Sequence, residues 1–159
     1  MYRYPLTIFA NIKLQQGKTK RVENVNVENG GNIMDKRMIT NIHEDIIKVL
    51  VERLEKMPER AFLTYEELCK RIGTQVHYRN VASYLGDISC WCNEIGAPML
   101  STLVINNSSN RPGKGYYKLY AELYGKSVRS LDEEQVFISE YQKVASYRGW
   151  KKFKYYLGI

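Results

Sequence analysis

An apolar stripe between residues 78 and 95 constrains the fold more strongly than any other feature of the chain. Its members are spaced three and four residues apart, as on one face of an amphipathic helix. Gly96 then offers a C-terminal cap, and Pro98 prevents the helix from continuing. The pattern predicts a long helix from about Tyr78 to Ile95. Its apolar face comprises Val81, Tyr84, Leu85, Ile88, Trp91 and Ile95.

Two shorter helices are predicted before it. The first ends at Pro58, and Asn41 with Glu44 has the spacing of a capping box at its start. The second begins at Thr64-Tyr65-Glu66-Glu67, another capping box, and ends at Gly73. A very short extended piece lies between the two helices. The stripe of the first helix is Ile42, Ile46, Val49, Leu50 and Leu54, and the extended piece is Ala61-Phe62-Leu63.

A β-hairpin is predicted after the long helix. Residues 100–105 and 116–120 read as strands, and the residues between them are polar and contain Pro and Gly. Helix, short strand, helix, helix, strand, loop, strand is the element order of a winged helix, in which the last hairpin is the wing. We therefore predict an α+β fold with a winged-helix-like core at residues 33–124.

Different structures are predicted on the two sides of this core. Residues 6–14 alternate between apolar and polar side chains and three valines mark a returning strand, so residues 1–32 are predicted to form an N-terminal β-hairpin. Ser130 with Glu133 has capping-box spacing ahead of a last helix. Cations alternate with aromatic residues beyond that helix. Residues 125–159 are therefore predicted to be a C-terminal helix with a basic aromatic tail.

The charge balance indicates an anionic partner. The 159 residues include 24 Lys and Arg against 17 Asp and Glu, which gives a net charge of +7 and a pI near 9.2. Nucleic acid, or a protein already loaded with it, would suit this charge, although many basic domains bind no nucleic acid. The sequence contains no apolar run of the roughly 20 residues that a membrane span needs, and its start is not that of a signal peptide. We expect a cytoplasmic protein.

Few residues have the arrangement that catalysis or cofactor binding requires. The three cysteines and two histidines lack the spacing of a disulfide framework or of a zinc site. Glu66, Glu67 and the acids of residues 132–134 fall in predicted first helical turns, where they favour the helix dipole. Residues 111–115 have the composition of a phosphate-binding loop but do not join a strand to a helix. We expect no metal, no cofactor and no small-molecule substrate.

Part of the chain resembles a known DNA-binding family. Residues 63–73, LTYEELCKRIG, look like the start of the DNA-binding domain of alkylguanine alkyltransferases and alkyltransferase-like proteins. Residues 79–86 resemble the recognition helix of that family, and residues 98–100 resemble its lead into the active strand. The likeness covers about residues 60–120. It extends to a domain found beside nucleases in bacterial defence genes, which is similar at residues 103–106 and 112–115.

The chain departs from that family at the nucleophile. The alkyltransferases carry a Pro-Cys-His-Arg segment on the strand after the recognition helix, whereas residues 101–105 here read STLVI. Thiolate activation needs a Cys with a base or cation beside it, and this strand has neither Cys nor His. Alkyl transfer is therefore excluded, and we predict that the protein is not an enzyme.

The predicted winged helix suggests a way of binding DNA. Its third helix would enter the major groove while the wing contacts phosphates. Asp87 argues against this hypothesis, because it lies one turn beyond Ser83 on the same outward face and would repel phosphates. Contacts with the bases are predicted for Gln75, His77, Tyr78, Arg79, Asn80 and Ser83, and contacts with the DNA backbone for Arg111, Lys114 and Lys118.

The basic aromatic tail offers a second candidate surface. Its aromatic residues could stack on bases or fill hydrophobic pockets of a partner protein. Alternatively, the tail folds back, buries its aromatic side chains against the core and leaves its lysines in solvent. The aromatic residues are Trp150, Phe153, Tyr155 and Tyr156, and the candidate contact lysines are Lys151, Lys152 and Lys154.

Taken whole, the chain resembles the small anti-CRISPR proteins that mobile elements of Gram-positive bacteria direct at type II effectors of the Cas9 kind. This resemblance implies a non-enzymatic inhibitor that binds guide-RNA-loaded Cas9 in the bacterial host and prevents cleavage of target DNA. The alternative is a winged-helix DNA-binding regulator or accessory protein of a mobile element, with double-stranded DNA as its partner. A non-catalytic sensor of modified bases is a third hypothesis.

Overall fold

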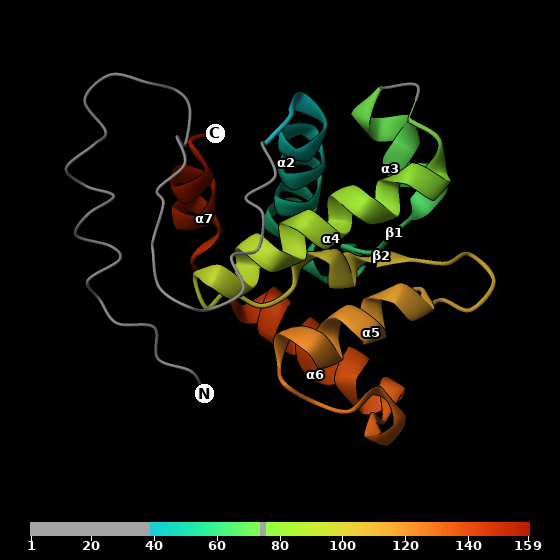
Figure 1. Ribbon diagram of the computed structural model, residues 1–159. Helices are drawn as coiled ribbons and strands as arrows, with labels where there is room; N and C mark the ends of the chain where they lie inside the picture. The colour runs from blue at the N-terminus through green and yellow to red at the C-terminus, as the bar shows by residue number, and fades with distance from the viewer. Residues whose placement is uncertain (1–38, 74–75) are drawn as a thin grey trace. The chain divides into compact units, whose positions relative to one another are not determined.

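Six α-helices and one pair of short strands make up the part of the chain that the computed structural model describes, residues 39–73 and 76–159 (Figure 1). Short 3-10 turns at Pro58–Arg60, Leu100–Leu103 and Val128–Ser130 lie between them. The strands are β1 (Leu63–Thr64) and β2 (Val104–Ile105). The helices are α2 (Asn41–Lys56), α3 (Tyr65–Ile72), α4 (Tyr78–Glu94), α5 (Lys114–Leu123), α6 (Glu133–Ser146) and α7 (Trp150–Leu157).

The three helices predicted between residues 41 and 95 are confirmed, and local capping chemistry fixes their ends. At the start of α3, the Thr64 hydroxyl accepts a hydrogen bond from the Glu67 amide at 3.1 Å, and the Glu67 carboxylate accepts one from the Thr64 amide at 2.8 Å. Gly73 ends α3 with a φ of 63°, a left-handed conformation that favours glycine. α2 is capped by Thr40 rather than by the predicted Asn41, so His43 occupies the third helical position.

The two strands pair in parallel and tie the start of α3 to the segment that follows α4. Leu63 lies opposite Val104, and Thr64 lies opposite Ile105. Leu63, Val104 and Ile105 are all buried. Parallel strands are usually covered on both faces, and apolar side chains on each strand suit that position.

The predicted winged-helix fold is wrong, because the described residues after α4 are mostly helical and form no hairpin. The segment predicted as the return strand, residues 116–120, lies inside α5. Tyr116, Tyr117 and Tyr120 are buried together with Ala121, which is the spacing of one helical face. This packing overrides the general preference of tyrosine for strands. The 3-10 turn at Leu100–Leu103 leaves only two residues of the other predicted strand extended.

The N-terminal hairpin predicted for residues 1–32 lies outside the described residues. At the other end, α7 packs its apolar face into the core. Phe153 is fully buried, and Trp150 and Leu157 are nearly so. The Tyr156 hydroxyl also donates a hydrogen bond of 2.8 Å to Glu94 at the end of α4. Of the two alternatives for the tail, the structure agrees with the one in which it folds back, except that Tyr155 remains 63% exposed.

The core positions α4 between two groups of helices. α4 contacts α2 and α3 through buried residues such as Val81 and Ile88, and it contacts α5 elsewhere on its surface (Figure 1). A second apolar cluster forms around α5 and includes Met99 and Val136. Because its neighbours hold the C-terminal half of α4, the exposed residues of this helix gather in its N-terminal half. These are Tyr78, Arg79, Asn80, Ala82 and Ser83.

Candidate nucleic-acid interface

The first turn of α4 carries a cluster of ring and cation side chains. The His77 ring caps the helix by accepting a hydrogen bond from the Arg79 amide at 3.3 Å. The Tyr78 ring lies beside it, with 4.4 Å between the ring centroids, and Tyr78 is 46% exposed. The Arg79 guanidinium lies 5.8 Å from the Tyr78 centroid. The cluster therefore presents aromatic faces and a positive charge at the N-terminal end of a helix, where anions are favoured.

Asn80 and Ser83 continue this exposed face along α4. The Ser83 hydroxyl donates a hydrogen bond to the Asn80 carbonyl at 2.9 Å, within the helix. Its oxygen lone pairs and the Asn80 side-chain amide face the surface, since both residues are exposed. The sequence from His77 to Gly86 contains no Asp or Glu. This half of α4 can therefore approach an anionic partner without repulsion from its own side chains.

The N-terminal end of α5 supplies two further cations. Lys114 opens this helix and Lys118 follows one turn later, and both are exposed. α5 packs against α4 near Gly86, where a Cβ would lie 4.0 Å from Leu119, an ordinary van der Waals distance. The amide of Gly113 donates to the Tyr65 hydroxyl at 3.4 Å, which ties the start of α5 to α3. Both α4 and α5 run from right to left in Figure 1, so their N-terminal ends face the same side.

We call the group formed by Arg79, Asn80, Ser83, Lys114 and Lys118 the α4–α5 surface. None of its three cations makes an ion pair with a residue that the structure describes. The nearest acid along α5 is Glu122, one turn beyond Lys118. Arg79, Asn80 and Ser83 lie on a helix, as the sequence predicted, whereas Lys114 and Lys118 lie on a helix instead of the predicted wing; their role in binding stays a prediction.

Asp87 does not lie where the sequence pattern placed it. Its carboxylate is turned toward α2 and accepts a hydrogen bond from the His43 ring at 3.1 Å, and its side chain is only 15% exposed. This contact turns the carboxylate away from the outward face of α4, which weakens the objection that it would repel phosphates there. Sequence patterns missed the role of His43, because its partner is 44 residues away.

The surroundings of His43 fix its ring. The ring is 3% exposed and its Nδ1 accepts a hydrogen bond from the Thr40 amide at 3.0 Å. Its edges and faces contact the rings of Tyr84 and Trp91, with centroid distances of 4.9 and 4.8 Å. Burial lowers the pKa of His43, and the neighbouring Asp87 carboxylate opposes this shift only in part.

Arg111, predicted to contact the DNA backbone, is engaged within the protein. Its guanidinium donates to both carboxylate oxygens of Glu134, at 2.6 and 2.7 Å. It also lies over the Phe137 ring, 4.7 Å from the centroid. This bidentate contact holds the loop before α5 against α6, and the predicted contact of Arg111 with the DNA backbone stays a prediction.

The candidate lysines of the tail form a separate group. Lys151 and Lys152 are exposed on α7 and Lys154 is partly exposed. α7 is attached to the C-terminal end of α4 through Glu94, which lies about 22 Å along the helix axis from Arg79. The structure thus divides the assigned residues into two basic regions. Gln75, the remaining one, lies outside the described residues.

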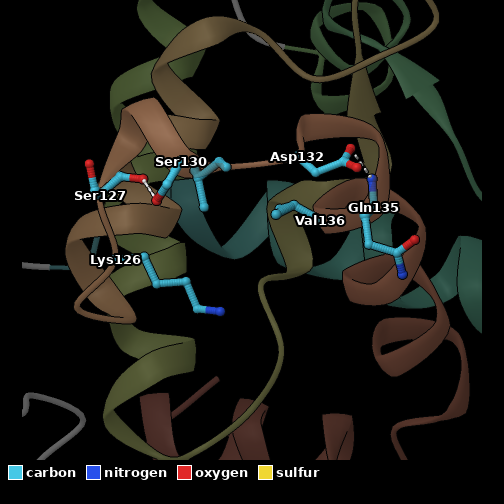
Figure 2. A pocket seen from close by; sticks show the side chains of 7 residues that line it. Lys126, Ser127, Ser130, Asp132, Gln135 and Val136 are labelled. Carbon is cyan, nitrogen blue, oxygen red and sulfur yellow. Dashed lines mark hydrogen bonds between the residues drawn. The ribbon is translucent and has the colours of Figure 1, made fainter.

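A pocket of about 450 Å³ lies between the end of α5 and the start of α6 (Figure 2). Two of its polar groups make local hydrogen bonds, one within the 3-10 turn and one that caps α6. The Ser130 hydroxyl donates to the Ser127 carbonyl at 3.0 Å, and Asp132 accepts from the Gln135 amide at 3.1 Å. Lys126 reaches into the same region (Figure 2). Ser130 and Asp132 therefore already have local partners.

The buried cysteine of α4 is a poor nucleophile. Burial raises the pKa of Cys92 to about 12, so the thiol is protonated at neutral pH. Burial also raises the pKa of Cys69, while the nearby Glu66 carboxylate adds to this shift.

Within the described residues, no three or more His, Cys, Asp or Glu side chains gather as candidate metal ligands. None of the described helices combines the length and the apolar character that a membrane crossing requires. Comparison with protein-family models, curated proteins and solved structures gives no match to this chain. The candidate interface is therefore defined by its own residues.

Proposed function

We propose that the protein binds double-stranded DNA through the α4–α5 surface, as a non-catalytic regulator or accessory protein in the bacterial cytoplasm. The observation that carries this proposal is the withdrawal of Asp87 from the outward face of α4 by His43 at 3.1 Å. It leaves Arg79 in the first turn of α4, and Lys114 and Lys118 lie in the first turns of α5, a helix that packs against α4. Helix N-termini and cations together form a favourable site for phosphate groups.

We expect different residues of the surface to contact the DNA backbone and the bases. Lys114 and Lys118 on α5 suit phosphate contacts, because they are exposed at a helix end and carry flexible charges. The exposed half of α4 then faces a groove, and the major groove is wide enough to admit a helix. Asn80 and Ser83 can exchange hydrogen bonds with base edges there, and Arg79 can contact a phosphate at the edge of the groove.

Three phosphate contacts give this proposal a quantitative signature. Each contact releases counterions, so the logarithm of the binding constant should fall with the logarithm of salt concentration with a slope of about −2.7. Lys114→Ala/Lys118→Ala should reduce that slope to about −0.9 and weaken binding roughly eightfold per lysine at about 0.1 M salt. Anisotropy of a labelled duplex, measured at several salt concentrations, gives both quantities.

A matched control variant removes two lysine charges from α2 instead of α5. Lys48 and Lys56 lie on α2 and pair with Glu44 and Glu52. Lys48→Ala/Lys56→Ala should retain most of the affinity and nearly all of the salt slope. Equal losses in the two double variants would contradict a localised interface, and failure of the wild-type protein to bind duplex DNA would contradict the proposal itself.

Inhibition of guide-RNA-loaded Cas9 is a second candidate function, and the outer face of α7 favours it. Lys151 and Lys152 are exposed there, and Tyr155 is 63% exposed. This region lies about 22 Å along α4 from Arg79, so only a large partner could engage both basic regions at once. An effector protein that carries RNA has the required size and charge.

Gel filtration tests this second candidate. The protein is mixed with guide-loaded Cas9 from a Gram-positive host in elevated salt, which suppresses non-specific charge pairing. Co-elution at fixed stoichiometry, weakened by Lys151→Ala/Lys152→Ala, would support it. Separate peaks with several host effectors would argue against it and leave duplex DNA as the partner to pursue.

A further inference from the structure

Asp87 occupies a sensitive position on α4. It is the first acid of this helix and lies four residues after Ser83, and residues four apart are neighbours on a helix surface. A carboxylate that extended outward from this position would stand beside the α4–α5 surface. Instead it reaches across to α2, where it meets His43 at 3.1 Å.

We propose that His43 is a positioning residue for DNA binding: it holds the Asp87 carboxylate against α2 and so keeps negative charge off the α4–α5 surface. This inference rests on the proposed function and names a residue that controls it without touching DNA. His43 is 3% exposed, so a direct contact with a partner is excluded by its burial.

The hydrogen bonds of His43 give its ring one orientation. A backbone amide can only donate, so the Thr40 amide at 3.0 Å makes Nδ1 an acceptor. The ring hydrogen then lies on Nε2, which donates to Asp87 at 3.1 Å. Contacts with Tyr84 and Trp91 prevent the ring from turning away. α2 therefore presents a fixed hydrogen-bond donor, the His43 ring, to Asp87, whose charge would otherwise lie beside the outward face of α4.

Two substitutions separate the functions of the two ring nitrogens. In His43→Asn, the shorter side chain places its amide near the position of Nδ1. There it can accept the hydrogen bond from the Thr40 amide, but it cannot reach Asp87. In His43→Gln, the longer side chain places its amide near the position of Nε2, where it can still donate to Asp87. The two variants are matched in polarity and differ in which contact they keep.

Duplex binding is measured for both variants, for Asp87→Asn and for His43→Asn/Asp87→Asn, with circular dichroism to check folding. His43→Asn should weaken binding about threefold, the effect of one charge roughly 6 Å from a phosphate in water. His43→Gln should bind like wild type. Asp87→Asn alone should change nothing, and added to His43→Asn it should restore the affinity. The deficit of His43→Asn should shrink as salt rises, because screening weakens repulsion.

The outcomes distinguish this inference from the proposed function. If the wild-type protein binds no duplex DNA, both are overturned. If it binds and His43→Asn binds equally well, or if Asp87→Asn fails to rescue that variant, only the role of His43 is overturned. An increase in affinity from Asp87→Asn alone would also overturn it, because the carboxylate would then already face the DNA.

Discussion

The buried Glu140 carboxylate on α6 accepts a hydrogen bond from the backbone amide of Met99 at 2.9 Å. The same oxygen accepts a second hydrogen bond from the Tyr124 hydroxyl at 3.0 Å, and the other oxygen lies 3.3 Å from the Lys143 ammonium. Glu140 is fully buried. It therefore joins α6 to the segment that leads into β2, and it does so through directed bonds that apolar packing cannot supply.

Glu140→Gln should destabilise the protein by about 1–3 kcal/mol, because an amide cannot accept at both of its ends and one buried partner is left unsatisfied. Glu140→Leu should cost about 3–5 kcal/mol, since it removes the acceptor from all three donors. Urea denaturation followed by circular dichroism measures both values. Losses below about 0.5 kcal/mol for both variants would show that the network contributes little.

The packing of the C-terminal helix gives a second prediction. Phe153 on α7 is fully buried, so Phe153→Ala should cost about 3–5 kcal/mol of unfolding free energy through lost contacts and a cavity. Lys151→Ala on the same helix is the control, because Lys151 is exposed and should change stability by less than about 0.5 kcal/mol. Similar small effects for both variants would mean that α7 does not stabilise the fold.

Local signals in the sequence predicted α2, α3 and α4, because caps and apolar stripes act over a few residues. The Thr64–Glu67 capping box and the left-handed Gly73 are of this kind. The prediction of a wing is wrong for a physical reason. Tyrosines suit strands by propensity, and only their common burial in one helical face identifies α5. The sequence contains both that spacing and the strand propensity, and only packing against the rest of the protein decides between them.

The candidate surface likewise has one part that follows from local sequence signals and another part that does not. The exposed half of α4 follows from its stripe, which places Arg79 and Ser83 opposite the buried side. Two features of the surface depend on contacts between distant residues. The Asp87 carboxylate accepts a hydrogen bond from His43, 44 residues earlier, and the Arg111 guanidinium pairs with Glu134, 23 residues later. Hydrophobic periodicity assigns a residue to a face, but it does not show which polar partner the fold brings to it.

The titration of His43 predicts a dependence of stability on pH. Burial holds its pKa below the 6.5 of the unfolded chain, so the unfolded state binds a proton first as the pH falls. The stabilising contribution is complete above pH 6.5 and is lost as the pH falls from 6.5 through the lower folded value. Protonation at Nδ1 also removes the acceptor for the Thr40 amide.

Urea denaturation of the wild-type protein and of His43→Gln at several pH values isolates this contribution. The difference in unfolding free energy between the two should be constant above pH 6.5 and should narrow below it. His77, which caps α4 at the surface, is present in both proteins and cancels in the comparison. A difference in unfolding free energy that widens as the pH falls would contradict a lowered pKa for His43.

A close contact at Gly149 gives the last prediction. The Tyr147 ring lies so close to this glycine that an added Cβ would overlap it. The ring cannot simply move, because it packs edge-on against Trp150 with 4.8 Å between the centroids. Gly149→Ala should therefore displace Tyr147 and cost about 1–3 kcal/mol, as overpacking does.

Gly115→Ala is the matched control for this substitution. A Cβ on Gly115 in α5 would meet nothing within 4 Å, and alanine is the better helix former. This variant should gain about 0.4–1 kcal/mol, mainly by restricting the unfolded chain. Urea denaturation measures both variants, and tryptophan fluorescence should report the disturbance near Trp150 in Gly149→Ala only. Equal stability of the two variants would show that the Tyr147 ring is free to move.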